Sequence, residues 1–170
     1  MTTSTPIRKP RSLSSTWKLI IAVLLCEAIG FTSGLMGSAG MNAWFDQLQK
    51  PSWNPPAYLF APVWTLLYCL MGIAFWLIWK NETNVALKRN AYFAFALQLF
   101  LNFWWSIIFF NFQSPFFALI EILVMWLAIL LTIFRFAKIS KTAAWLLVPY
   151  LLWVSFASVL NYTIWSLNKS

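Results

Sequence analysis

Five long apolar segments constrain the fold of this chain more strongly than any other feature of its sequence. They cover residues 17–36, 59–79, 91–110, 116–136 and 143–167. Each is close to the roughly 20 residues that a helix needs to cross about 30 Å of hydrocarbon. In lipid every backbone polar group needs an internal partner, and these runs lack the alternation of a β-barrel strand. The sequence therefore predicts an all-α membrane protein, built as a five-transmembrane-helix bundle.

Composition agrees with a membrane protein and excludes several classes of chemistry. Charged residues make up 9% of the 170 residues and hydrophobic residues 61%, whereas soluble domains carry about 25% charged residues. The chain contains no histidine, which excludes histidine-based acid–base catalysis and Ser–His–Asp triads. Cys26 and Cys69 both fall inside apolar runs and match no disulfide framework or zinc spacing. We therefore expect no catalytic residue, no metal site and no resident cofactor.

Basic residues predict the orientation in the membrane. Ten of the twelve Lys and Arg residues fall in the tail and the start of the first span, within residues 80–89, or within residues 135–141. The other two, Lys50 and Lys169, belong to the opposite side. By the positive-inside rule, the N-terminus lies inside and the C-terminus outside. The same rule explains the net charge of +8 without nucleic acid, which we do not expect as a partner.

Two segments outside the spans differ in character. Residues 1–15 are basic and rich in Ser, Thr and Pro, which is typical of a flexible tail preceding a membrane domain over residues 16–170. The connection over residues 37–58, called loop one below, contains three prolines and two tryptophans. A long connection of this composition is typically functional. We predict that it folds as a lid over the mouth of the bundle.

Polar and small residues predict which face of each span points inward, because a lipid-facing position needs only to be apolar. In the first span Glu27, Gly30, Gly34 and Ser38 share one helical face, and the two glycines suggest close helix packing. Glu121 is a second acid within a predicted span. A carboxyl group in hydrocarbon is costly, so structural and functional roles are both open for these two acids.

Aromatic residues form 19% of the chain, and interfacial belts explain only part of them. Trp64, Trp105 and Trp153 fall on inward-facing stripes instead. Inward tryptophans offer stacking surface and an N–H donor, as a pocket for a flat apolar ligand requires. Filling of a five-helix core explains them equally well, so the residues alone leave both interpretations open.

Four segments of the sequence have long and unusual motifs, namely residues 44–56 (WFDQLQKPSWNPP), 61–72 (APVWTLLYCLMG), 98–105 (QLFLNFWW) and 149–165 (PYLLWVSFASVLNYTIW). They resemble the TspO/translocator protein family, also called the tryptophan-rich sensory or peripheral-type benzodiazepine receptor family. The resemblance covers nearly everything from residue 30 onward. It implies a five-helix bundle, a homodimer, and a ligand pocket near the loop-one end.

The resemblance also implies a ligand class and a set of binding residues. Family members bind porphyrins such as protoporphyrin IX, and animal members bind cholesterol and synthetic benzodiazepine-type ligands. The positions that correspond to the family's pocket are Trp53, Ala61, Val63, Trp64, Asn102, Trp105, Phe117, Trp153, Ala157 and Leu160. Phe117 stands where the family often has tryptophan. The sterol motif fails, because six residues separate Tyr162 from the next basic residue.

These expectations converge on an integral, multi-pass membrane protein of a bacterial envelope or an organelle outer membrane. Its expected function is to bind porphyrins and similar planar hydrophobic ligands, with a role in tetrapyrrole transport, regulation or stress signalling. Its expected partners are that ligand, membrane lipid and a second copy of the chain. The alternatives are a light-dependent porphyrin-degrading enzyme, with Trp64 and Trp153 as the implicated tryptophans, and a sterol or lipid carrier.

Overall fold

The computed structural model describes residues 13–40 and 43–169. Five segments of this part are long and apolar enough to cross a membrane, namely Ser15–Gly40, Ala57–Lys80, Val85–Asn111, Pro115–Ala137 and Lys141–Asn168. No strand occurs among the described residues. The predicted all-α, five-helix class is confirmed, and the chain is an integral membrane protein. Most of the predicted tail lies outside the described residues.

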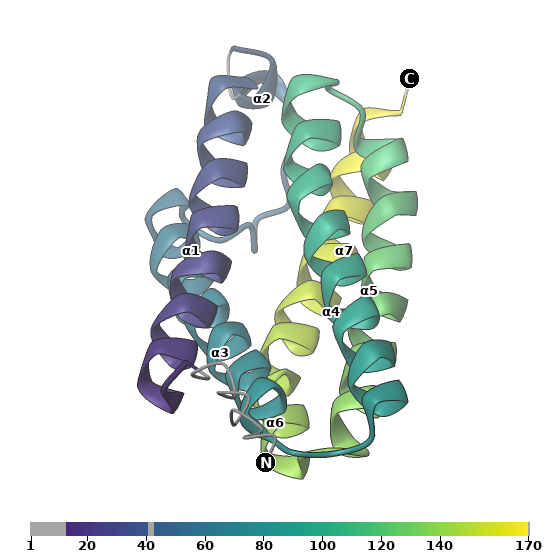
Figure 1. Cartoon of the computed structure of the whole chain (residues 1–170). Helices are drawn as coiled ribbons and strands as arrows, with labels where there is room; N and C mark the ends of the chain where they lie inside the picture. Colours follow the sequence, from purple (N-terminus) through teal and green to yellow (C-terminus); the bar gives the residue numbers. More distant parts are fainter. Residues whose placement is uncertain (1–12, 41–42, 170) are drawn as a thin grey trace, which may run out of the picture.

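Each span has its own helix labels in Figure 1. The elements are α1 (Ser15–Gly40), α2 (Ala43–Gln47), the short 3-10 helix η1 (Ala57–Leu59), α3 (Phe60–Lys80), α4 (Val85–Ser106), the π-helical turn η2 (Ile107–Asn111), α5 (Pro115–Ala137), α6 (Lys141–Leu146) and α7 (Val148–Asn168).

Local chemistry moves several helix ends away from the predicted bounds. The first helix continues to Gly40, so residues 37–40 of the predicted loop one are helical. The third span begins at Val85, six residues early, because the Asn84 side chain caps the backbone N–H of Ala86 at 2.8 Å. The fifth span is interrupted at Leu147, and Pro149 lies in the first turn of α7. This proline therefore follows directly on a break between two helices.

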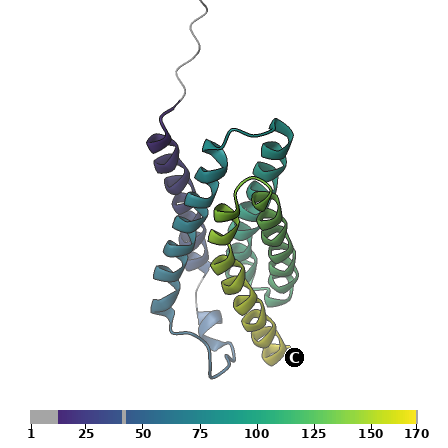
Figure 2. The same ribbon diagram turned by 90° about the horizontal axis from the view of Figure 1, so that it is seen from below.

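The helices form two groups, and α1 links them at the loop-one end by packing against α4 and η2. Helix α1 packs along α3, while α5 packs against both α4 and α7. Figures 1 and 2 show α1 and α3 side by side at one edge of the bundle. Helix α6 joins the groups at the other end by packing against α3. Close packing of α1 on α3 depends on Gly72, where an added Cβ would lie 2.6 Å from the Val23 Cα.

The two ends of the bundle differ in charge. Ser15 and Asn168, the outer ends of the first and last helices, lie at opposite ends of the molecule (Figure 1). The end formed by the start of α1, the α3–α4 connection and α6 is called the basic end below. Its described Lys and Arg residues are Lys18, Lys80, Lys88, Arg89, Arg135, Lys138 and Lys141. The arrangement agrees with the predicted orientation, which awaits a direct measurement.

Candidate functional site

A cavity of about 550 Å³ lies between the helices, next to loop one. Its walls come from α1, α3, α4, α5 and α7, and residues of loop one complete it. This volume lies within the range of pockets that enclose drug-sized ligands. The lining is mainly apolar, and it includes three indole rings, one carboxyl group and one amide side chain that come from different helices. They are Trp64, Trp105, Trp153, Glu27 and Asn102.

Ring contacts hold the three cavity tryptophans in place. The Trp64 ring lies 5.6 Å from the Tyr68 ring between centroids. The Trp153 ring makes an edge contact with Phe60 at 6.1 Å, so α7 meets the start of α3 there. Trp105 stacks on Phe109 at 5.2 Å. Aromatic pairs at such separations contribute about 0.5–1.5 kcal/mol beyond their buried area. The indole planes are therefore fixed before any ligand enters.

The tryptophans differ in the state of their N–H donors. Trp105 Nε1 donates to the Asn161 amide oxygen at 3.2 Å. Among the described residues, the indole N–H groups of Trp64 and Trp153 have no hydrogen-bond acceptor. An indole N–H in an apolar site normally finds a partner. Trp64 and Trp153 therefore each offer an unused donor next to the cavity.

Asn102 occupies the centre of a buried hydrogen-bond network beneath the cavity. Its amide oxygen accepts from the Tyr68 hydroxyl, and its Nδ2 donates to the Tyr150 hydroxyl at 2.8 Å. The Tyr150 hydroxyl in turn donates to Met125 Sδ at 3.6 Å. This network ties α3, α4, α5 and α7 together, so Asn102 acts first as interhelical support.

Helix α1 supplies the outer wall of the cavity. Its predicted polar stripe faces inward, because Glu27, Gly30, Gly34 and Ser38 all line the cavity. The two glycines play different parts. A Cβ on Gly30 would lie 2.1 Å from the Tyr68 ring, whereas a Cβ on Gly34 would meet nothing within 4 Å. The prediction that both permit close helix packing is right for Gly30 and wrong for Gly34, which opens onto empty space.

Loop one contributes directly to the cavity wall through Phe45, Asn54 and Pro55. Two reciprocal hydrogen bonds of 2.9 Å join the Gln49 backbone to the Asn168 side chain at the end of α7. Phe45 also makes edge contacts with Phe109 and Phe110 at 6.2 and 5.3 Å. Loop one is thus anchored to both η2 and α7, as a cover over the cavity requires.

Lys50, the basic residue of loop one, is engaged within that loop. Its ammonium group donates to the Phe45 carbonyl at 2.6 Å and lies 4.3 Å from the centre of the Phe45 ring. Lys50 is not among the residues that line the cavity. Its present contacts favour a structural role in which it holds the turn after α2.

The chain was compared with known protein families and proteins. The model of the TspO/MBR family matches residues 22–166, which is most of the chain and includes all five spans. The chain belongs to the TspO/MBR family. It is 46% identical over 155 residues to the tryptophan-rich protein TspO of Chlorobaculum tepidum, covering 88% of this chain and 95% of that protein.

Two further TspO/MBR relatives show lower identity. The tryptophan-rich protein TspO of Archaeoglobus fulgidus is 41% identical over 151 residues, covering 89% of this chain and 97% of the relative. The human translocator protein is 38% identical over 126 residues, covering 74% and 75%. The family likeness inferred from four sequence segments is therefore confirmed, and it extends over most of each relative.

Six of the ten predicted binding residues of this TspO/MBR chain meet in the cavity. They are Ala61, Trp64, Asn102, Trp105, Trp153 and Ala157. Trp53 is 46% exposed and makes an edge contact with Phe156 at 5.9 Å, outside the lining. Val63 packs against the main core, and Leu160 is buried in a second core cluster with Phe109 and Ala118.

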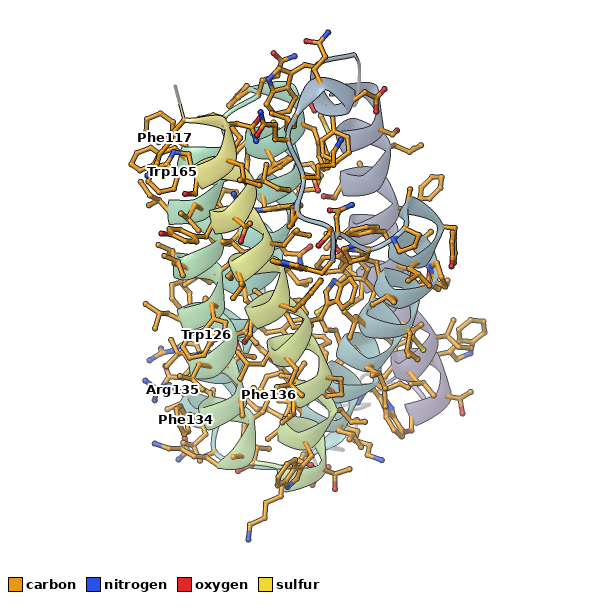
Figure 3. All side chains as sticks on the ribbon, turned by 180° about the vertical axis from the view of Figure 1, so that it is seen from behind. Phe117, Trp126, Phe134, Arg135, Phe136 and Trp165 are labelled. Carbon is orange, nitrogen blue, oxygen red and sulfur yellow. The ribbon has the colours of Figure 1, made fainter. Side chains whose placement is uncertain are left out.

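Phe117 does not reach the cavity. Its side chain is 63% exposed, and Figure 3 shows it near Trp165 at the outer edge of the bundle. The prediction that Phe117 points into the bundle is wrong, because the next residue, Ala118, is the fully buried one. The buried face of α5 continues from Ala118 through Ile122 and Met125. One residue corresponds to about 100° around a helix, so the shift turns Phe117 outward.

Several cavity residues were absent from the predicted binding set. Helix α1 contributes Phe31, Gly34 and Leu35, and α3 contributes Tyr68. A signal for α1 was present in the sequence, since the stripe from Glu27 to Ser38 had been assigned to the bundle interior. That stripe was interpreted as a packing surface. Only the tertiary structure shows that part of it borders the cavity.

Proposed function

We propose that this chain binds a planar hydrophobic ligand of the porphyrin class in the cavity covered by loop one. The observation that carries the proposal is the convergence of Trp64, Trp105 and Trp153 on one cavity of about 550 Å³. Three indole rings from three different helices offer flat apolar surface to a macrocycle. The failed sterol motif gives no comparable support to a sterol ligand.

The polar groups of the cavity fit the edge and centre of such a ligand. The unused indole N–H groups of Trp64 and Trp153 would donate to carboxylate or carbonyl oxygens at the ligand edge. The Glu27 carboxyl group lines the α1 wall and would accept from pyrrole N–H groups. Because Asn102 is already bonded to two tyrosines, we assign it the role of a support for Trp64 and its neighbours.

Titration of the purified protein with protoporphyrin IX in the dark tests this proposal. We expect saturable binding, weakened by Trp153→Phe by about 1–2 kcal/mol because the substitution removes one donor and keeps most of the apolar surface. Trp145→Phe is the matched control, because Trp145 is 72% exposed on α6 and absent from the lining. Equal weakening by both substitutions, or no saturable binding, contradicts the proposal.

Illumination of the same samples separates a binding protein from a degrading enzyme. We expect the absorption of bound porphyrin to bleach in light at the same rate with the wild-type protein and with Trp64→Phe. Faster bleaching by the wild-type protein that disappears in Trp64→Phe would instead support the light-dependent enzyme. A dimer, which the family resemblance implied, is part of the proposal and is tested by the mass of the detergent-purified particle.

A further inference from the structure

A second, smaller hollow lies at the basic end, on the opposite side of the bundle from the cavity described above. Its volume is about 130 Å³, and Phe75, Trp79 and Tyr92 line it. The first two belong to the last turns of α3 and the third to the beginning of α4. All three side chains are half-buried. The hollow therefore faces the surroundings of the helix bundle from between α3 and α4.

A stack of phenyl rings forms the back wall of this hollow. Phe75 stacks on Phe95 with ring centroids 4.8 Å apart, and Phe95 stacks on Phe136 at 5.7 Å. Phe95 and Phe136 are at most 2% exposed, so they fix the position of Phe75 from behind. Tyr92 closes one side at 5.3 Å from Phe75. The hollow is a rigid, aromatic feature of the fold, not a gap between mobile side chains.

Two lysines from different helices lie beside Trp79, although neither belongs to the lining of the hollow itself. The Lys88 ammonium group donates to the Trp79 carbonyl at 3.0 Å. The Lys18 ammonium group lies 5.9 Å from the centre of the Trp79 ring. Within residues 13–40 and 43–169, neither lysine forms an ion pair with a carboxylate. An ammonium group carries three donors, so each lysine keeps donors for an external anion.

We propose that this hollow binds an anionic phospholipid of the inner leaflet. The Lys18 and Lys88 ammonium groups bind the headgroup phosphate, and one acyl chain lies against Phe75, Trp79 and Tyr92. Charge complementarity selects this occupant, because in the orientation predicted from the basic residues the basic end faces the leaflet that carries anionic lipids. The aromatic wall then accounts for the chain, since an apolar hollow beside a bilayer is filled most simply by hydrocarbon.

The structural role of Lys88 is compatible with this site. Its hydrogen bond to Trp79 satisfies a carbonyl in the last turn of α3, which is a position that favours a cation. The same bond holds the ammonium group next to Trp79, which is one of the residues that line the hollow. Lys18 has no such structural bond among the described residues, so it is the better residue to substitute in a test.

Native mass spectrometry of the full chain in detergent tests the site. The protein is titrated with dioleoyl phosphatidylglycerol and, separately, with dioleoyl phosphatidylcholine. We expect preferential retention of one phosphatidylglycerol, weakened about fivefold by Lys18→Gln, as the loss of one lysine near an anionic headgroup predicts. Lys138→Gln is the matched control with the same charge change at the same end, and we expect less than a twofold effect.

Three results overturn the proposal. Equal retention of the two lipids shows that no anion is recognised. Equal weakening by Lys18→Gln and Lys138→Gln shows that only the overall surface charge matters. Displacement of the lipid by glycerol 1-phosphate as readily as by dihexanoyl phosphatidylglycerol shows that the aromatic hollow holds no acyl chain. Circular dichroism melting of both variants confirms that each is folded under the conditions of the titration.

Discussion

Trp105 of α4 and Asn161 of α7 are joined by a hydrogen bond of 3.2 Å from the indole N–H to the amide oxygen. The Asn161 Nδ2 donates onward to the Pro115 carbonyl at 2.8 Å. The bond places one cavity tryptophan in the framework of the bundle, while Trp64 and Trp153 keep their donors unused. Residues that look equivalent in the sequence therefore divide into support and contact surface.

This division predicts that replacing tryptophan by phenylalanine has different effects on stability at the two positions. Trp105→Phe removes the bond to buried Asn161 and should cost about 1–2 kcal/mol of unfolding free energy, lowering the Tm by several degrees. Trp153→Phe loses no protein hydrogen bond and should change the Tm by less than about 1 °C. Thermal unfolding in one detergent measures both. Equal Tm values for the two variants would show that the Asn161 bond contributes nothing measurable.

A pair of glycine substitutions tests the shape of the α1 wall. Gly30→Ala places a methyl group inside the Tyr68 ring volume, so it should destabilise the protein by about 1–3 kcal/mol. Gly34→Ala meets open space and should stabilise α1 by up to about 1 kcal/mol, since alanine is the better helix former. The Tm of each variant decides this, and a lower Tm for Gly34→Ala would contradict the open wall.

Enlargement of Ala157 should close the cavity without unfolding the protein. Ala157 is a half-buried lining residue of α7, one turn from Trp153. Ala157→Leu adds three carbon atoms on the cavity side and should abolish saturable protoporphyrin IX binding. We expect a change in unfolding free energy below about 1 kcal/mol, because the added atoms fill space and displace no neighbour. Loss of stability equal to the loss of binding would make Ala157 a core residue.

Removal of the Glu121 carboxyl group should stabilise the protein. Both carboxyl oxygens of Glu121 are buried and have no hydrogen-bond partner among the described residues. A buried polar group without a partner costs about 1–3 kcal/mol. Glu121→Leu should therefore raise the Tm by several degrees, and Glu121→Gln should raise it less. A fall in Tm for Glu121→Leu would show that the carboxyl group has a stabilising partner in the membrane.

The orientation of the chain is open to direct measurement. Five spans place the two termini on opposite sides, and the basic residues place the N-terminus inside. Single cysteines introduced as Ser4→Cys and Ser170→Cys, in a background with Cys26 and Cys69 replaced by serine, should react from opposite sides of sealed vesicles. Labelling of both positions by an impermeant reagent from one side would contradict the five-span topology.

The sequence by itself determined the number, type and approximate positions of the spans. Hydropathy and length are local properties, and lipid leaves helices as the form that these apolar runs adopt. Helix periodicity also placed Trp64, Asn102, Trp105 and Trp153 on inward faces. The family resemblance then grouped them as binding residues, and the structure brings them to one cavity.

Tertiary structure alone decided which inward residues border open space. Gly30 and Gly34 are four residues apart on one helical face, yet one touches the Tyr68 ring and the other faces the cavity. On α5 the inward-facing residue is Ala118, not Phe117, because the helix is rotated about its axis by about one residue from the predicted orientation. Such differences depend on the rotation, crossing and separation of whole helices. These are set by packing between residues far apart in the chain, because the residues on one helix do not fix its distance from another.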